Sequence, residues 1–208
     1  MKKILIFILV LFVSGCTVVR IDTSNIDTIV NVILSTDNDL YNHVGSGYKY
    51  YIPRGVSYID TDDLNDKLYS NGSYYYLYVD VISYTNGVKF EYEEKENVYY
   101  SRKISQEDGF DASGYLEINE GDNGLYHISF LYNYARIETV VEKENLNLAV
   151  LNSAYILSTI KFNTDVIDLM LDDDYFTNKE EKYDIFESKQ ESTSFIPYVE
   201  DDEENEEE

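Results

Sequence analysis

The sequence predicts an α+β protein in which helices pack against a largely antiparallel sheet. Between residues 48 and 142, short runs rich in tyrosine and β-branched residues alternate with turns rich in glycine, asparagine and aspartate. Apolar residues at helical spacing precede this region at 26–41 and follow it from residue 145. Short turns between successive strands connect antiparallel neighbours, whereas parallel pairs need long crossovers.

The first predicted element is a helix over residues 26–41, capped by Thr23 or Ser24, with its apolar residues on one face. Residues 48–59 predict two short strands that are separated by a turn containing Pro53. The other elements expected in this half are a polar segment with one helical turn at 60–72, the strongest strand over about twelve positions from Ser73, and strands at 88–92 and 98–104.

The second half of the sheet has clearer signals. Residues 115–119 and 125–133 predict a hairpin around the turn 120–124, and one more strand follows at 135–142. A helix is expected from Asn145, which is a plausible cap. Its apolar face would contain Leu146, Val150, Ser153, Ala154, Leu157 and Ile160. The helices expected after it are a shorter one at 164–171 and one opened by the capping-box pattern 177–180 and running to about Lys189.

The charge of the chain limits its possible partners, and its length indicates the number of domains. The 208 residues contain 40 Asp plus Glu against 16 Lys plus Arg, a formal net charge of −24. A polyanion repels nucleic acid, so that partner is excluded. We expect a single α+β domain over residues 23–199, which is large enough to bury a core. The acidic end, residues 200–208, is expected to be a disordered tail.

The N-terminal residues have the pattern of a targeting segment. Residues 1–15 combine two lysines, the apolar run Ile4–Val13 and small residues, which is the order of a secretory signal peptide. The apolar run is too short to span a bilayer, which takes about 20 residues.

The signal ends in Val13, Ser14, Gly15 and Cys16, which resemble the bacterial lipobox. That resemblance implies cleavage before Cys16 and a diacylglyceryl lipid, built from acyl chains such as palmitate, on its thiol. Residues 16–22 would then be a lipidated tether, and the protein would be held on the extracytoplasmic face of the cell membrane. A plain signal peptide with an incidental cysteine is the alternative.

Two segments of the domain resemble the PsbP-like fold. They are "GYKYYIPRG" at 47–55 and the strands and helix at 130–163. The resemblance implies an α/β/α sandwich, and its family consists mostly of non-enzymatic binding or assembly factors. Together with the lipobox, the chain also resembles uncharacterised lipoproteins of Gram-positive bacteria. One departure is Val56, where the family often has tryptophan, and no functional residue carries over.

Candidate catalytic and metal residues are few. His43 and His127 are the only histidines, and both are expected to be structural, with only His127 inside the fold. No catalytic residues, metal site or cofactor are predicted. Calcium is the exception left open, because oxygen ligands suit it, although solvated loops explain the acidic groups more simply. The calcium candidates are Asp60, Asp62, Asp63 and Asp66, with smaller groups at Asp108 and Asp111 and at 172–174.

The tyrosines indicate packing beneath helices first, with a binding surface as the alternative. Strand alternation places Tyr74, Tyr76 and Tyr78 on one sheet face and their neighbours on the other. Such rings either pack beneath helices or form an aromatic face for peptide or glycan.

The function that we expect is a membrane-anchored surface lipoprotein acting as a non-enzymatic binding or assembly module, with an unknown protein or cell-wall partner. The alternatives are a hydrolase of cell-wall glycan or peptide that uses acidic residues, and a solute-binding component of a transporter.

Overall fold

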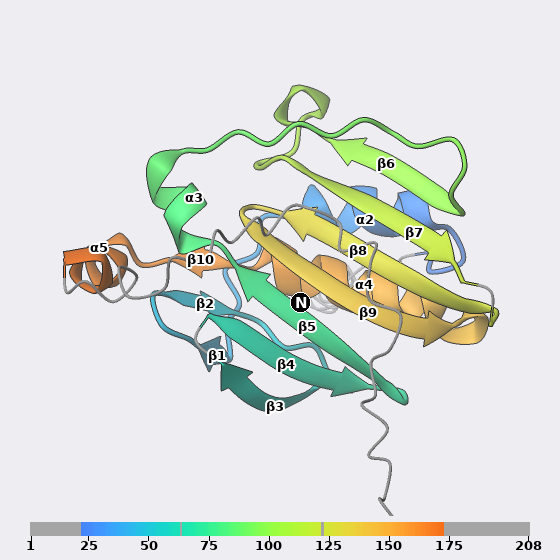
Figure 1. Cartoon of the computed structure of the whole chain (residues 1–208), viewed down its shortest axis with the longest axis horizontal. Coiled ribbons are helices and arrows are strands. Elements are labelled where there is room, and N and C mark those ends of the chain that lie inside the picture. The colour runs from blue at the N-terminus through green and yellow to red at the C-terminus, as the bar shows by residue number, and fades with distance from the viewer. Residues whose placement is uncertain (1–21, 63, 122, 173–208) are drawn as a thin grey trace, which may run out of the picture. The chain divides into compact units, whose positions relative to one another are not determined.

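The computed structural model describes residues 22–62, 64–121 and 123–172, all within one compact unit of the chain. They form helices, a large antiparallel sheet and a smaller sheet, which confirms the predicted α+β class (Figure 1). The helices are α2 (Ile26–Leu34), α3 (Val81–Asn86), α4 (Leu146–Ser158) and α5 (Thr164–Asp172). Single 3-10 turns lie at Gln106–Asp108 and Lys143–Asn145.

The large sheet consists of two antiparallel meanders. Its strands are β3 (Ser57–Asp62), β4 (Asn65–Ser70), β5 (Ser73–Val79), β6 (Tyr100–Ile104), β7 (Gly114–Glu120), β8 (Leu125–Tyr132) and β9 (Ala135–Glu142). Their order is β3-β4-β5-β9-β8-β7-β6. Tight turns connect β3 to β5 and β7 to β9, and the β5–β9 pair joins the two meanders into one sheet. The predicted hairpin of β7 and β8 and the strand β9 are therefore confirmed.

The small sheet connects the end of α4 to the large sheet. Its strands are β1 (His43–Val44), β2 (Tyr48–Tyr50) and β10 (Lys161–Phe162), with β2 in the centre. The Tyr51 backbone N–H donates to Thr159 Oγ1 at 3.0 Å, just after α4 ends. The hydroxyls of Tyr48 and Tyr50 both reach the Asp66 carboxylate on β4.

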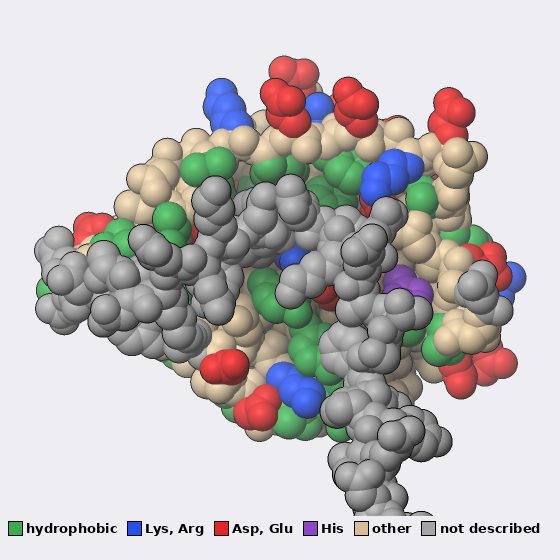
Figure 2. Space-filling view, viewed as in Figure 1, with side chains coloured by type: hydrophobic (Ala, Val, Ile, Leu, Met, Phe, Trp, Pro, Cys, Tyr) green, Lys and Arg blue, Asp and Glu red, His purple; other side chains and the backbone are tan. Residues whose placement is uncertain are grey.

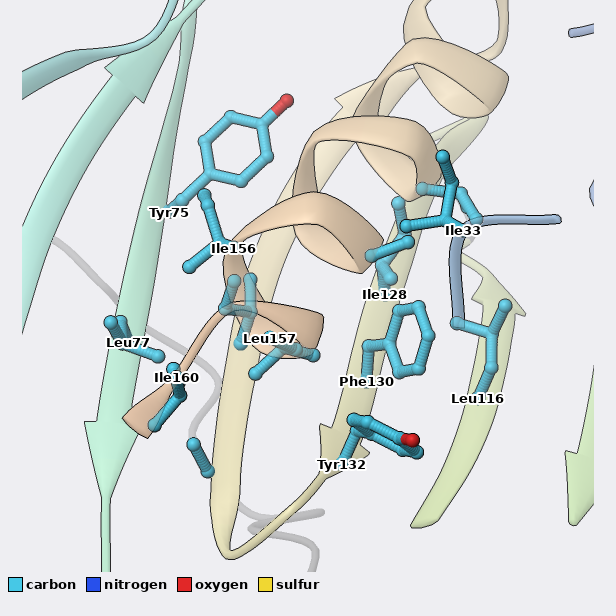
Figure 3. Packing of buried hydrophobic residues seen from close by; sticks show 14 of the residues in the cluster. Ile33, Tyr75, Leu77, Leu116, Ile128, Phe130, Tyr132, Ile156, Leu157 and Ile160 are labelled. Atoms are coloured by element: carbon cyan, nitrogen blue, oxygen red, sulfur yellow. The ribbon is translucent and has the colours of Figure 1, made fainter. Parts of the chain in front are cut away.

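The hydrophobic core lies between one face of the large sheet and the helices α2 and α4 (Figure 3). The apolar side of α4 points into it, with Val150, Ala154 and Leu157 fully buried. Ile33 of α2 lies beside Ile128 of β8 in the same core. The apolar face predicted for α4 is thus confirmed from Leu146 to Leu157, because burying it against the sheet is what stabilises the helix. Ile160, the last residue predicted on this face, is buried but follows the end of the helix at Ser158.

Both long helices cover the same sheet face, which we call the inner face. Within the described residues, the layers are therefore helices on one side and sheet on the other, rather than the three layers of the sandwich that the resemblance implies. Residues 88–99, an irregular segment that we call the strap, run from α3 along the β6 side of the sheet and then turn into β6 (Figure 1).

The first helix is shorter than predicted. It ends at Leu34, and its cap is Asn25, not Thr23 or Ser24, because Asn25 Oδ1 accepts the Thr28 N–H at 3.0 Å. The helix stops where Ser35 and Thr36 donate their hydroxyls back to helix carbonyls. Such side-chain bonds compete with continued helix. At the other predicted cap, Asn145 precedes α4 but makes no side-chain capping bond.

Three predictions in the middle of the chain are wrong. Residues 65–70 form β4 rather than a polar segment with a helical turn, because the polar Asp66 is accommodated inside. The strand from Ser73 ends at Val79, where Asp80 accepts the Ser83 N–H and starts α3. No strand forms at 88–92, because this part belongs to the strap. The strand predicted at 98–104 is present but shorter, as β6.

Candidate functional site

Strand β5 carries the three tyrosines on the outer face of the sheet. Tyr75, Leu77 and Val79 point to the core, while Tyr76 and Tyr78 are half-buried and Tyr74 is 46% exposed on the opposite side. The alternation is the one that the sequence predicts. It follows from the pleat of a strand whose other face is covered by α4.

Neighbouring strands add a further ring and two cations to these tyrosines. Register places Tyr69 opposite Tyr74, with ring centroids 5.2 Å apart, and Lys67 opposite Tyr76. The Lys67 ammonium lies over the Tyr74 ring, 4.6 Å from its centroid. We call this group the tyrosine face; its members are Tyr69, Tyr74, Tyr76, Tyr78, Lys67 and Arg136.

Arg136 is the most buried cation of the tyrosine face. It is 7% exposed, its guanidinium lies 5.4 Å from the Tyr78 centroid, and Nη1 is 3.4 Å from a Glu138 carboxylate oxygen. Its Nε makes no hydrogen bond within the described residues. Burial raises the pKa of Tyr78, and Glu138 adds to this rise while Arg136 opposes it. Tyr78 therefore stays a neutral phenol that can donate a hydrogen bond.

The tyrosine face combines flat apolar surface, phenol groups and positive charge. Figure 2 looks onto this side of the sheet, and hydrophobic side chains (green) and cationic side chains (blue) lie next to one another among acidic ones. Rings of this kind contact apolar faces of a ligand while their hydroxyls and the cations bind its polar groups. The cations Lys67 and Arg136 come from β4 and β9, so only strand pairing reveals them.

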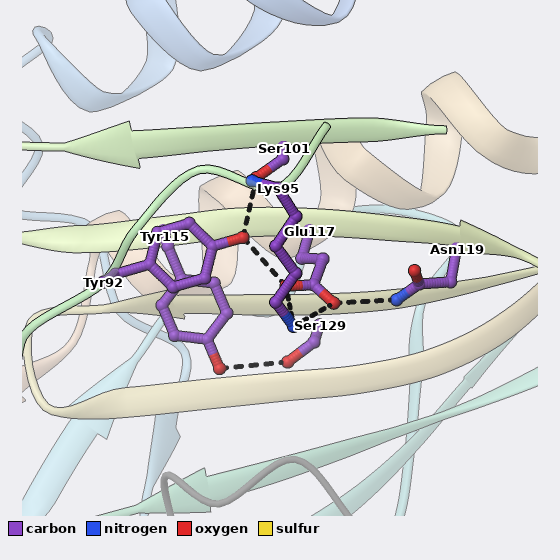
Figure 4. A network of polar contacts seen from close by, with 7 residues as sticks. All are labelled: Tyr92, Lys95, Ser101, Tyr115, Glu117, Asn119 and Ser129. Atoms are coloured by element: carbon purple, nitrogen blue, oxygen red, sulfur yellow. Dashed lines mark hydrogen bonds and ion pairs between the residues drawn. The ribbon is translucent and has the colours of Figure 1, made fainter. Parts of the chain in front are cut away.

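The strap is fixed to the outer face by a polar network centred on Glu117 of β7 (Figure 4). Tyr92 stacks on Tyr115 with ring centroids 4.3 Å apart and donates its hydroxyl to Glu117 at 2.8 Å. Lys95 Nζ lies 2.9 Å from the same carboxylate, which also accepts from Asn119. Glu117 is 5% exposed, so its charge is satisfied almost entirely by protein groups.

The strap network makes stability depend on pH. Burial alone would raise the pKa of Glu117, but hydrogen bonds from Asn119, Lys95 and Tyr92, with the Lys95 charge, hold it below its usual value. A lowered folded-state pKa contributes stability above the unfolded value of about 4.3. That contribution is lost as the pH falls through the still lower folded value.

We therefore expect a Glu117→Gln variant to be less stable than the wild type at pH 7. The difference should shrink as the pH falls below about 4. Urea unfolding at a series of pH values measures it. Glu96→Gln, an exposed change on the strap, is the control. A stability difference for Glu117→Gln that stays constant between pH 7 and pH 3 would contradict the assignment.

The calcium candidates do not gather at one point. Asp60 and Asp62 are exposed on the edge strand β3, whereas Asp66 is buried on the inner face of β4, opposite Thr61. Asp63 lies outside the described residues. Within the described residues, no group of three or more His, Cys, Asp or Glu side chains is placed to hold a metal ion.

Asp66 instead binds two buried tyrosines. Its Oδ2 accepts from Tyr48 at 2.9 Å and from Tyr50 at 2.8 Å, while its Oδ1 has no partner within the described residues. Burial, followed by the Asp66 charge and hydrogen bond, raises the pKa of both tyrosines. This cluster joins the small sheet to β4.

The two histidines differ from the expectation in their placement. His127 is exposed on the outer face of β8, not inside the fold. His43 is half-buried between the rings of Tyr50 and Tyr58, at centroid distances of 5.0 Å and 4.5 Å. Its Nε2 is 3.7 Å from the Asp66 carboxylate. These contacts give His43 a structural role.

Comparison with protein-family models, curated proteins and solved structures found no match to this chain. The lipobox residues 13–16, the capping-box helix at 177–189 and the acidic tail 200–208 lie outside the described residues. Among residues 22–62, 64–121 and 123–172, no helix has the length and apolar character needed to cross a membrane.

Proposed function

We propose that this protein is a bacterial surface lipoprotein, held at the extracytoplasmic face of the cell membrane by a lipid on Cys16. The support is the sequence Val13-Ser14-Gly15-Cys16, which closes an apolar run with small residues and the chain's single cysteine. Two acyl chains give stable anchoring, because each buried CH₂ contributes about 0.8 kcal/mol and one chain alone is marginal. The six residues that follow Cys16, 17–22, reach at most about 20 Å when extended, so the folded part stays near the membrane.

The folded part acts as a non-enzymatic binding module, and its ligand is a glycan of the cell wall. The observation that carries this proposal is the tyrosine face, in which Tyr74, Tyr76 and Tyr78 follow one another at about 7 Å along a rigid strand. Sugar rings have apolar faces that stack on aromatic rings and hydroxyls that bind phenols. Lys67 and Arg136 supply positive charge for the acidic groups of wall polymers.

Co-sedimentation with purified, insoluble cell walls tests the binding proposal. We expect the wild type to sediment with the walls. A Tyr69→Ser/Tyr74→Ser double variant should bind at least about tenfold more weakly, because the loss of each ring removes contact area with the ligand. Tyr99→Ser is the matched control, because Tyr99 is also 46% exposed but packs on Tyr126, away from the tyrosine face. Equal binding of the wild type and the double variant would contradict the proposal.

The same assay separates binding from hydrolysis. A binding module leaves the walls intact during incubation, whereas the alternative function, a wall hydrolase, releases soluble sugar or peptide fragments. Measuring reducing ends in the supernatant therefore distinguishes the two, and time-dependent release by the wild-type protein would overturn the non-enzymatic proposal.

A further inference from the structure

A second candidate site is a hollow between the small sheet and α5, away from the tyrosine face. Its volume is about 580 Å³, within the range of small-molecule sites. Its apolar wall includes Val44 of β1, Phe162 of β10, and Val166 and Met170 of α5. Figure 1 shows α5 following β10 at this end of the molecule.

Two lysines of the hollow stand directly opposite each other across the β2–β10 pair. Lys49 and Lys161 are cross-strand partners, and both line the hollow. Like charges in this position are destabilising. The chain as a whole has far more acidic than basic residues, so two adjacent cations here are not a consequence of composition.

The contacts of the two lysines indicate what the hollow accepts. Lys161 forms an ion pair with Asp39, whose side chain is 81% exposed, and Lys49 lies 4.1 Å from the centroid of the exposed Tyr41 ring. Asp39 and Tyr41 come from the loop between α2 and β1. A carboxylate from a surface loop therefore neutralises one lysine, and the other has a ring as its cation–π partner.

We propose that this hollow binds an amphipathic carboxylate with a hydrocarbon chain, a fatty-acid-like ligand. The carboxylate displaces Asp39 and lies between Lys49 and Lys161, where it relieves their repulsion. The hydrocarbon chain lies along Val44, the cross-strand partner of Lys49, and along Val166 and Met170 of α5. The N-terminus of α5 at Thr164 adds favourable potential for an anion, although Asp165 in its first turn opposes part of it. This site is independent of the lipid anchor and of glycan binding.

Isothermal titration of the full-length protein with decanoate tests the proposal. We expect decanoate to bind, and acetate and decyltrimethylammonium, which lack the chain or carry the opposite charge, to bind at least about tenfold more weakly. A Lys49→Gln/Lys161→Gln double variant should lose at least about tenfold in affinity, because two charge-assisted contacts disappear. Asp39→Asn should bind several-fold more tightly, because the competing carboxylate is gone.

Two further variants complete the design. Met170→Ser should weaken decanoate binding through the apolar wall while leaving both lysines in place. Lys103→Gln, an exposed lysine on β6, should bind as the wild type does. Thermal unfolding of each variant confirms that it is folded. Equal binding of decanoate and decyltrimethylammonium, wild-type affinity in the double lysine variant, or no decanoate binding by the wild type would overturn the proposal.

Discussion

An Asp66→Ala variant is expected to lose about 3 kcal/mol of unfolding free energy, a large fraction of the stability of a typical domain. The reason is that Asp66 accepts two hydrogen bonds from tyrosines that are themselves buried, with Tyr50 fully inaccessible. Without the carboxylate, both hydroxyls lack an acceptor inside the protein, and each unsatisfied buried group costs about 1–3 kcal/mol. Urea unfolding followed by circular dichroism measures the loss.

Two sets of variants separate this effect from a general loss of acidic charge. Asp62→Ala, an exposed change on β3, should alter stability by less than about 0.5 kcal/mol. A triple variant with Asp66→Ala, Tyr48→Phe and Tyr50→Phe should be more stable than Asp66→Ala alone, because removing all the partners leaves nothing unsatisfied. If Asp66→Ala and Asp62→Ala were equally stable, the cluster would not join the small sheet to β4 as described.

The elements that the sequence predicts well are those whose hydrophobic pattern agrees with their burial. In β8 and β9, alternate side chains such as Phe130 and Ile137 meet in the core, and their period is visible in the sequence. In α4, Val150 and Leu157 lie on the same buried face, at helical spacing. The turn between β7 and β8 has glycine and asparagine where a reversal of the chain needs them.

The elements that the sequence does not predict are those in which a tertiary contact overrides the local pattern. Strand β4 contains Asp66 at a core position, and the hydroxyls of Tyr48 and Tyr50, from a separate sheet, make that position possible. Residues 88–92 of the strap have strand-like composition, yet Tyr92, and Lys95 just after it, bind side chains of β7 instead of forming a paired strand.

The same difference between local pattern and tertiary contact applies to the candidate sites. The alternation of Tyr74, Tyr76 and Tyr78 is a local property, so the sequence indicates their common face. Lys67 and Arg136 join them only through the pairing of β4 and β9 with β5. In the hollow, Lys49 and Lys161 become neighbours through a strand pair between distant parts of the chain, which no local pattern indicates.

The second large effect is expected for a Cys16→Ser variant, which tests the proposed position of the protein at the membrane. Serine keeps the size of the side chain but cannot form the thioether to a diacylglyceryl group. Without the acyl chains, the apolar area that binds the protein to the bilayer is absent. We therefore expect the variant to lose nearly all stable association with membranes.

Labelling of growing cells with radioactive palmitate, followed by separation of membranes, tests this central claim most directly. We predict that the wild-type protein carries the label and sediments with the membranes, whereas Cys16→Ser carries no label and does not. Adding Ser24→Cys to the Cys16→Ser variant should not restore the label, because that cysteine lies outside the lipobox. An unlabelled wild type, or a Cys16→Ser variant that stays equally membrane-bound, would contradict the account.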